Sequence, residues 1–172
     1  MEQLDLEAVL LIGIYGAGKS SVAAEIADFL EEHDVPFAAI DLDWLAWANL
    51  EEGHGEVGER MMLANLAAMV ANYRGAGMRR FVLAGAFADR AEIDRLQATL
   101  GMPVRVVCLA VPLEVIEARL SASPTSGRKN DLVVAREAFA ANVGEGLEEL
   151  LVDGTRNIGD IASEIVAWLG WL

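Results

Sequence analysis

A glycine-rich stretch near the start of the chain has the residue types and spacing of a phosphate-binding loop. Residues 13–20 read Gly-Ile-Tyr-Gly-Ala-Gly-Lys-Ser and match G-x-x-x-x-G-K-[ST] at every specified position. Glycines let the backbone wrap closely around a phosphate, and a helix that begins near the lysine adds the positive end of its dipole. The pattern predicts that Lys19 reaches the β- and γ-phosphates of ATP and that the Ser20 hydroxyl ligates Mg²⁺. The expected cofactor-binding residues are Gly13, Tyr15, Gly16, Ala17, Gly18, Lys19, Ser20 and Ser21.

Two carboxylates follow the next short apolar segment, in the sequence Ile40-Asp41-Leu42-Asp43. Side chains alternate along a strand, so Asp41 and Asp43 lie on the same side if the strand continues that far. Ligands of open α/β sheets bind at the carboxyl ends of strands. We therefore expect these two residues to be catalytic or metal-binding. An alternative is that Asp43 caps a helix that begins at Trp44.

The elements that must position these residues alternate regularly between short apolar segments and longer segments of helical periodicity. The run at residues 8–12 is continuously apolar, which is typical of a strand buried on both faces of a parallel sheet. The alternation predicts a three-layer α/β/α sandwich around a five-stranded parallel sheet, formed by one domain over residues 1–172. Strands are expected at 8–12, 37–40, 81–84, 104–110 and 150–152, and helices at 20–32, from about 43, 57–73, 91–100, 113–120, 132–147 and 158–169.

Residues 121–130 form the only loop rich in Ser, Pro and Gly, and we interpret it as a mobile lid at about 121–131. Arg119 precedes this loop, and Arg128 and Lys129 lie within it. This spacing would let cations close on a triphosphate, with Arg128 as the favoured transition-state cation. A solvated loop cation is the alternative for Arg128.

Composition restricts the partners and the compartment. The chain has 172 residues and a net charge of −14, which disfavours a nucleic-acid partner. No apolar run is long enough to span a membrane, and the acidic start of the chain lacks the features of a signal peptide. The single cysteine, Cys108, suits a reducing compartment, as a small buried hydrophobe. We therefore expect a cytoplasmic monomer or homodimer that binds a small molecule, with no nucleic-acid or membrane partner.

Two classes of nucleotide-binding protein do not fit the sequence. A small GTPase would need an N-K-x-D guanine-reading motif and a D-x-x-G switch, and neither occurs at a suitable position. An oligomeric motor ATPase would need an acidic pair at the end of a strand, but the third expected strand ends with Leu83-Ala84-Gly85-Ala86.

In element order and in the 13–20 loop, the chain resembles the P-loop small-molecule kinases of nucleoside-monophosphate-kinase-like fold, such as shikimate kinase, gluconate kinase, adenylylsulfate kinase and chloramphenicol phosphotransferase. The resemblance implies that one carboxylate after the second strand accepts the proton of the attacking hydroxyl and that the other holds Mg²⁺ through water. Asp41 is favoured as the base, while Asp43 stays open for both roles. The implied catalytic residues are Lys19, Asp41, Asp43 and Arg128, and the implied Mg²⁺ ligands are Ser20 and Asp43.

The same resemblance extends to the lid, the adenine site and the acceptor site. Arg119 would contact ATP, although a second lid arginine of the family pattern is replaced here by Ser123. The segment 153–155 would surround the adenine with Arg156 and Asn157 beside it, or would be a plain turn with a helix cap near Asn157. The segment Gly85-Ala86-Phe87 would permit close approach of a substrate to the backbone, or would only allow close packing of sheet and helix. The acceptor site would involve Trp44, Trp47, His54 and Tyr73.

The function implied is ATP-dependent transfer of the γ-phosphate to a hydroxyl of a small molecule. An alternative is a nucleotide-binding sensor without significant kinase activity. A kinase acting on an RNA end is disfavoured by the acidic charge, whereas a nucleotide-sugar substrate stays open.

Overall fold

A five-stranded parallel sheet forms the centre of the fold. The computed structural model describes residues 5–48, 55–122 and 128–172. The strand order is β2-β3-β1-β4-β5, and every pair is parallel. Along the chain the elements are β1 (Glu7–Ile12), α1 (Lys19–Glu32), β2 (Phe37–Asp41), the 3₁₀ helix η1 (Leu42–Ala46), α2 (Gly55–Gly75), β3 (Arg80–Ala84), α3 (Arg90–Leu100), β4 (Val104–Ala110), α4 (Leu113–Ala122), α5 (Arg128–Ala140), β5 (Leu150–Asp153) and α6 (Ile158–Leu169).

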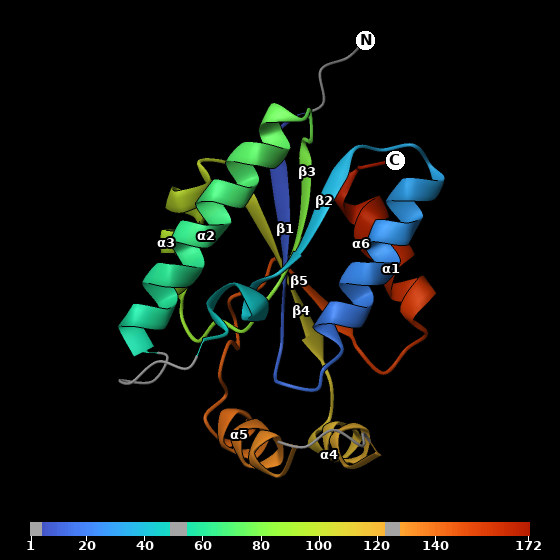
Figure 1. Cartoon of the computed structure of the whole chain (residues 1–172). Helices are drawn as coiled ribbons and strands as arrows, with labels where there is room; N and C mark the ends of the chain where they lie inside the picture. Colours follow the sequence, from blue (N-terminus) through green and yellow to red (C-terminus); the bar gives the residue numbers. More distant parts are fainter. Residues whose placement is uncertain (1–4, 49–54, 123–127) are drawn as a thin grey trace.

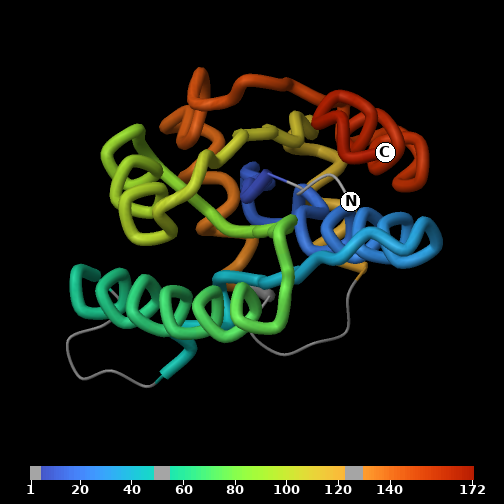
Figure 2. The backbone as a smooth tube through the Cα atoms, turned by 90° about the horizontal axis from the view of Figure 1, so that it is seen from above, coloured from blue at the N-terminus to red at the C-terminus, as the bar shows by residue number. Residues whose placement is uncertain are grey.

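Helices cover both faces of the sheet. α1 and α6 pack against each other on one face, and α2 and α3 lie together on the other (Figure 1). The view from above separates the same two pairs (Figure 2). The three-layer α/β/α sandwich and the five-stranded parallel sheet expected from the sequence are confirmed. No helix in the described ranges is long and apolar enough to cross a membrane.

The central strand β1 contributes to the hydrophobic core on both faces of the sheet. Val9 and Leu11 belong to the core cluster under α1 and α6, whereas Leu10 and Ile12 belong to the cluster under α2 and α3. All four side chains are completely buried. Truncating one such leucine to alanine costs about 2–5 kcal/mol of folding free energy. The strand that leads into the 13–20 loop is therefore firmly held.

The N-terminus of α1 differs from those of α3 and α6. Asp89 caps α3 by accepting from the backbone N–H of Glu92, and Asn157 caps α6 by accepting from Gly159. Gly18, which precedes α1, has no side chain to offer as a cap. Because the first N–H groups of a helix have no partner within the helix, those of α1 can serve a ligand.

α4 and α5 pack against each other beyond the carboxyl ends of the strands (Figure 1). The loop bounds expected at 121–130 are wrong at both ends, because α4 extends to Ala122 and α5 already begins at Arg128. Residues 123–127 lie outside the described ranges. The helix expected over 132–147 ends at Ala140, because Asn142 and Gly144 have positive φ angles of 51° and 79° and interrupt it.

Candidate functional site

The 13–20 loop follows a path that requires glycine. Gly13 has φ +148° and Gly16 has φ +87°, a region that L side chains rarely adopt. A Cβ atom at Gly13 would lie 3.0 Å from the carbonyl oxygen of Leu109, and one at Gly16 would lie 3.1 Å from Cγ2 of Ile116. The loop therefore passes directly against β4 and α4, with no room for a side chain at these two positions.

Lys19 lies folded over this loop. Its Nζ donates to the carbonyl oxygens of Gly13 at 2.9 Å and Ile14 at 3.4 Å. The residue is only 7% exposed. Burial lowers the pKa of the Lys19 ammonium group, while the negative charges of Asp43 and Asp41 oppose this effect. A buried cation with carboxylates nearby thus lies where the sequence pattern expects phosphate.

Ser20 and Asp41 join the start of α1 to the end of β2. The Ser20 hydroxyl donates to Asp41 Oδ2 at 2.6 Å, and Asp41 Oδ1 accepts from the backbone N–H of Asp43 at 3.1 Å. The second contact caps η1. The capping carboxylate is therefore Asp41, and the alternative of Asp43 as the cap of a helix beginning at Trp44 is wrong. A helix cap forms here because β2 ends at Asp41, so that Leu42 already belongs to η1.

Asp43 lies beyond this cap with its carboxyl group close to Lys19 and Asp41. Desolvation by the surrounding protein raises the pKa of Asp43, the charge of Lys19 opposes the rise, and the charge of Asp41 adds to it. A carboxylate whose pKa is raised towards neutrality is better suited to accept a proton than an ordinary surface aspartate.

A cavity of about 450 Å³ lies over the 13–20 loop. Its lining brings together most of the cofactor-binding residues expected from the sequence, together with one carboxylate. It is lined by Tyr15, Gly16, Ala17, Gly18, Lys19, Ser20, Ser21, Val22, Asp43, Arg119, Leu120, Gly154, Ile158 and Ile161.

Arg119 connects three parts of this cavity. Its guanidinium group donates from Nη1 to the carbonyl oxygen of Ala17 at 3.1 Å and from Nη2 to that of Gly154 at 2.9 Å. The side chain belongs to α4 and thereby ties this helix to the 13–20 loop and to the turn after β5. That Arg119 contacts ATP stays a prediction.

Arg156 does not line this cavity. Its Nη1 donates to the carboxylate of Glu164 on α6. The neighbouring Asn157 caps α6, and the Asp153 side chain accepts from Thr155, so the segment 153–157 forms a turn followed by a capped helix. A role for Arg156 beside adenine stays a prediction.

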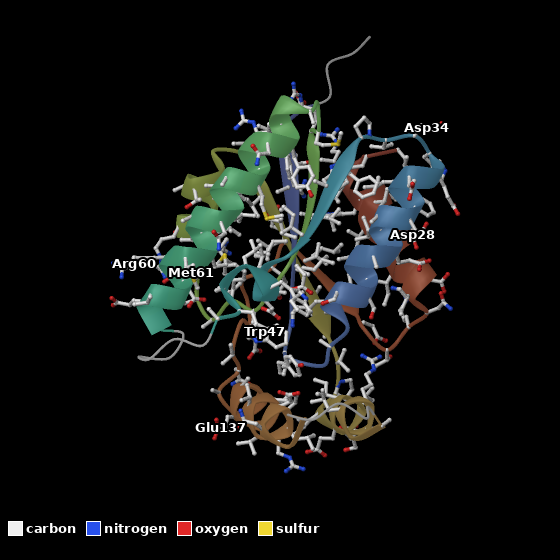
Figure 3. All side chains as sticks on the ribbon, in the orientation of Figure 1. Asp28, Asp34, Trp47, Arg60, Met61 and Glu137 are labelled. Carbon is white, nitrogen blue, oxygen red and sulfur yellow. The ribbon has the colours of Figure 1, made fainter. Side chains whose placement is uncertain are left out.

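A second cavity of about 460 Å³ lies next to the first, between η1, α2 and the segment that follows β3. Asp43 lines both cavities. Gly85 and Phe87, from the segment that follows the third strand, line the second one. That this segment lets a substrate approach the backbone stays a prediction. Trp47, labelled in Figure 3, lies beside η1 and also lines it.

Sequence reasoning missed two acidic residues of the second cavity. Glu59 on α2 and Glu92 on α3 line it. Each lies within the first two turns of a helix that begins near the carboxyl ends of the strands, and this position was the available signal. An acidic residue near a helix N-terminus is also explained by the helix dipole alone, which is why the pattern did not single them out.

The other expected acceptor residues have different outcomes. The ring of Trp44 contacts that of Trp47 at a tilt of 36°, with the ring centroids 4.6 Å apart. Tyr73, near the far end of α2, is not among the described residues that line the cavity. His54 lies outside the described ranges. For Arg128 the structure describes the backbone, which begins α5, but not the side chain.

Comparisons with known proteins give matches in structure only. No family model matches the chain, and no curated protein matches it in sequence. An unliganded sugar kinase from Janibacter sp. HTCC2649 aligns with a TM-score of 0.67 at 20% identity, over 96% of this chain and 95% of that one. A gluconokinase from Sinorhizobium meliloti 1021 aligns with a TM-score of 0.61 at 22% identity, over 95% and 91%. An APS kinase from Mycobacterium tuberculosis, in complex with AMPPNP and APS, aligns with 0.60 at 22% identity, over 96% and 98%.

The alignments cover nearly the whole of each chain, so the likeness extends to the helices at the carboxyl edge of the sheet as well as to the sheet itself. At these identities the likeness concerns the fold. The resemblance inferred from the sequence is confirmed at this level. The chain therefore has the fold of the P-loop small-molecule kinases.

Proposed function

We propose that the protein transfers the γ-phosphate of ATP to a hydroxyl group of a small molecule. The position of Asp43 carries this proposal, because this carboxylate lines both the cavity over the 13–20 loop and the neighbouring cavity. Phosphoryl transfer needs a nucleotide and an acceptor side by side, with a proton acceptor where they meet. Asp43 lies at that junction.

The nucleotide phosphates are held by the backbone N–H groups of the 13–20 loop and the uncapped start of α1. Lys19 exchanges its contacts with the carbonyl oxygens of Gly13 and Ile14 for the β- and γ-phosphates, where its charge stabilises the transition state. Arg119 and Gly154 form the wall on the adenine side. The exchange is supported by the contacts of the buried ammonium group, which forms no hydrogen bond to a carboxylate in the described part of the chain.

Magnesium fits beside Ser20 and Asp41. Mg²⁺ prefers oxygen ligands and takes only a few from protein, completing its shell with phosphate and water. The hydroxyl of Ser20 and the carboxylate of Asp41 lie 2.6 Å apart and offer two such oxygens. Bound there, Mg²⁺ would neutralise charge on the β- and γ-phosphates.

Asp43 is the proton acceptor in this proposal, whereas the sequence favoured Asp41. Both Asp41 oxygens already accept hydrogen bonds, and Asp43 alone of the two lines the acceptor cavity. The acceptor oxygen attacks the γ-phosphorus, the bond to the bridging oxygen breaks, ADP leaves, and the hydroxyl proton passes to Asp43. Desolvation, which raises the pKa of Asp43, suits this role.

The α4–α5 pair completes the proposal as a lid, within a single domain over residues 1–172. Arg119 already ties α4 to the loop, and α5 begins at Arg128. We assign to Arg128 the role of a cation that approaches the phosphates when the lid closes.

The test is an acceptor screen with purified protein, ATP and Mg²⁺, following ADP release over sugars, nucleosides, hydroxy acids and amino sugars. Lys19→Ala should lower kcat about 10²–10³-fold because it removes a transition-state charge. Asp43→Asn should lower kcat about 10²–10⁴-fold while ATP still binds. Asp28→Asn, an exposed aspartate on α1, is the matched control and should behave as the parent protein (Figure 3).

Two outcomes would contradict the proposal. Tight ATP binding without acceptor-stimulated turnover across the panel would favour a nucleotide sensor. Full activity of Asp43→Asn together with loss of activity in Asp41→Asn would return the base to Asp41.

A further inference from the structure

The proposed acceptor cavity has an unusual charge for a site next to phosphate. Its ionisable lining residues within the described chain are Asp43 from η1, Glu59 from α2 and Glu92 from α3, and none of the described lining residues is Arg, Lys or His. The three carboxylates come from three different elements. The compound that binds in this cavity accepts phosphate only if the protein is a kinase. That part of the inference therefore rests on the proposed function.

The carboxylates of Glu59 and Glu92 are each held by a hydrogen bond to one of their two oxygens. Glu59 Oε1 accepts from Arg95 Nε at 2.7 Å, and Glu92 Oε2 accepts from the backbone N–H of Ala88 at 2.6 Å. In the described part of the chain no hydrogen bond is made by the second oxygen of either group. Arg95 is not a lining residue, and half of its side chain surface is exposed. Each carboxylate is thus oriented and keeps one oxygen for a ligand.

Aromatic rings adjoin these carboxylates. Phe87 lines the cavity and is buried, whereas Trp47 lines it and is 71% exposed. The ring of Trp44 contacts that of Trp47 in a tilted arrangement and is itself 67% exposed. Exposed apolar rings that adjoin a cavity form a surface suited to a ligand, and the face of a tryptophan attracts a cation.

Carboxylates and exposed aromatic faces together recognise an ammonium group, since the first supply charge and hydrogen-bond acceptors and the second supply cation–π attraction. The same lining repels a carboxylate or phosphate on the acceptor. We propose that the acceptor is a hydroxyl compound that carries a protonated amine, such as an amino sugar or amino alcohol. Its ammonium group lies among Glu59, Glu92 and Trp47, and its hydroxyl lies at Asp43.

In the reaction, the hydroxyl oxygen forms a bond to the γ-phosphorus, the bond between that phosphorus and the bridging oxygen of ATP breaks, and the proton moves to Asp43. The products are ADP and a phosphate ester that still carries its ammonium group. The amine takes no part in bond making. It determines which compounds bind.

The experiment compares four sugars that differ in charge: glucosamine, N-acetylglucosamine, glucose and gluconate. With ATP and Mg²⁺ at neutral pH, kcat/KM should be at least about 10-fold higher for glucosamine than for either neutral sugar, because desolvated ionic contacts are lost when the charge is removed. Gluconate should be the poorest acceptor. Equal or higher kcat/KM for a neutral sugar or for gluconate would overturn the inference while the proposed kinase activity stands.

Variants separate a binding role from a structural one. Glu59→Gln and Glu92→Gln should each raise KM for glucosamine about 5–50-fold, with little change in kcat or in KM for glucose. Arg95→Gln breaks the same ion pair but leaves the cavity more negative, so it should leave KM for glucosamine unchanged or lower it. Glu56→Gln, an exposed glutamate one turn earlier on α2, is the control. Equal losses in Glu59→Gln and Arg95→Gln would assign Glu59 to structure only.

Direct binding keeps the inference testable if no sugar is phosphorylated. Isothermal titration calorimetry of the same four compounds, with a non-hydrolysable ATP analogue and Mg²⁺ present, should show heat for glucosamine that Glu59→Gln weakens. In that case the proposed phosphotransfer fails and the amine site stands. Failure of glucosamine to bind better than glucose would overturn the amine site.

Discussion

At the scale of single residues, Asp43 combines a functional position with a cost to stability. Desolvation raises the pKa of this carboxyl group, so the folded protein holds its proton more tightly than the unfolded chain does. As pH rises from about 4 through the raised pKa, the folded state therefore loses stability. The ionised carboxylate at neutral pH is destabilising, which is common where function requires a particular charge.

Asp43→Asn should accordingly raise stability and lower kcat together. Asparagine has the shape of the protonated acid and never ionises, so we expect the melting temperature at pH 7 to rise by about 1–2 °C. The difference should shrink as pH falls towards 4. Differential scanning calorimetry of both proteins between pH 4 and 8 measures this, with Asp28→Asn as control. A lower melting temperature at pH 7 would show that the ionised carboxylate stabilises the fold.

Cys108 gives a second prediction at this scale. Burial raises the pKa of its thiol to about 11, the charge of Glu148 adds to the rise, and Lys19 opposes it. At pH 7 only about one thiol in 10⁴ is then ionised. A disulfide reagent should react at least about 100-fold more slowly with the folded protein than with the protein in guanidinium chloride. The free energy of unfolding should fall between about pH 9 and 11, because the thiol loses its proton at a lower pH in the unfolded chain than in the folded protein. Similar reaction rates in both states would contradict this.

The sequence predicts the function of some site residues and not of others. Lys19 and Ser20 could be predicted because the motif fixes their spacing within one loop. The functions of Asp41 and Asp43 could not be separated, since their difference depends on where β2 ends and η1 begins. Glu59 has no local pattern beyond its place near a helix N-terminus, because its neighbours in the cavity come from distant parts of the chain.

At the scale of elements, Gly16 determines how closely α4 approaches the 13–20 loop. A Cβ atom there would lie 3.1 Å from side-chain atoms of both Ile116 and Leu120 on α4, in a backbone conformation with φ +87°. Gly16→Ala should therefore lower the free energy of unfolding by about 1–3 kcal/mol, since both the strain and the contact oppose it.

The control is Gly75→Ala at the end of α2, where a Cβ atom would have nothing within 4 Å. It should be neutral or slightly stabilising, because alanine favours the helix over glycine. Urea unfolding followed by circular dichroism measures both variants. Equal effects of the two would show that α4 moves away from the loop without cost.

The helix boundaries show which signals the sequence carries. The expected strands were confirmed to within a residue or two, because continuous apolar runs identify them. The end of α5 was placed too late, since the apolar residues of 141–147 continued the helical pattern past Asn142, Gly144 and Gly146. All three have positive φ angles. Asparagine and glycine are residue types that end helices, and this effect outweighs the hydrophobic periodicity.

At the scale of the whole molecule, the strand order brings the catalytic candidates together. In the sheet, β3 lies between β1 and β2, yet Ser20 and Asp41 meet. They meet because α1, which connects β1 to β2, runs over one face of the sheet. Sequence reasoning could predict that the carboxyl ends of strands carry the ligand. It could not give the order of the strands, which depends on packing between residues far apart in the chain.

Both core clusters share the strands β1, β3 and β4, so we expect the molecule to unfold as one unit. Fluorescence of the four tryptophans and far-ultraviolet circular dichroism should give coincident thermal transitions. Separate melting of the α4–α5 pair would instead produce an early change in circular dichroism alone, and would contradict a single cooperative domain.

Nucleotide binding should shift this single transition, because a ligand that binds only the folded state stabilises it by mass action. With Mg²⁺ present and ATP at 100 times its dissociation constant, the gain is about 2.7 kcal/mol, or about 5–10 °C for a chain of this length. Lys19→Ala should lose most of the shift, since the phosphates are the main binding contact, whereas Asp43→Asn should keep it. Differential scanning fluorimetry over an ATP series measures all three proteins. A shift that Lys19→Ala retains in full would place the nucleotide away from the 13–20 loop.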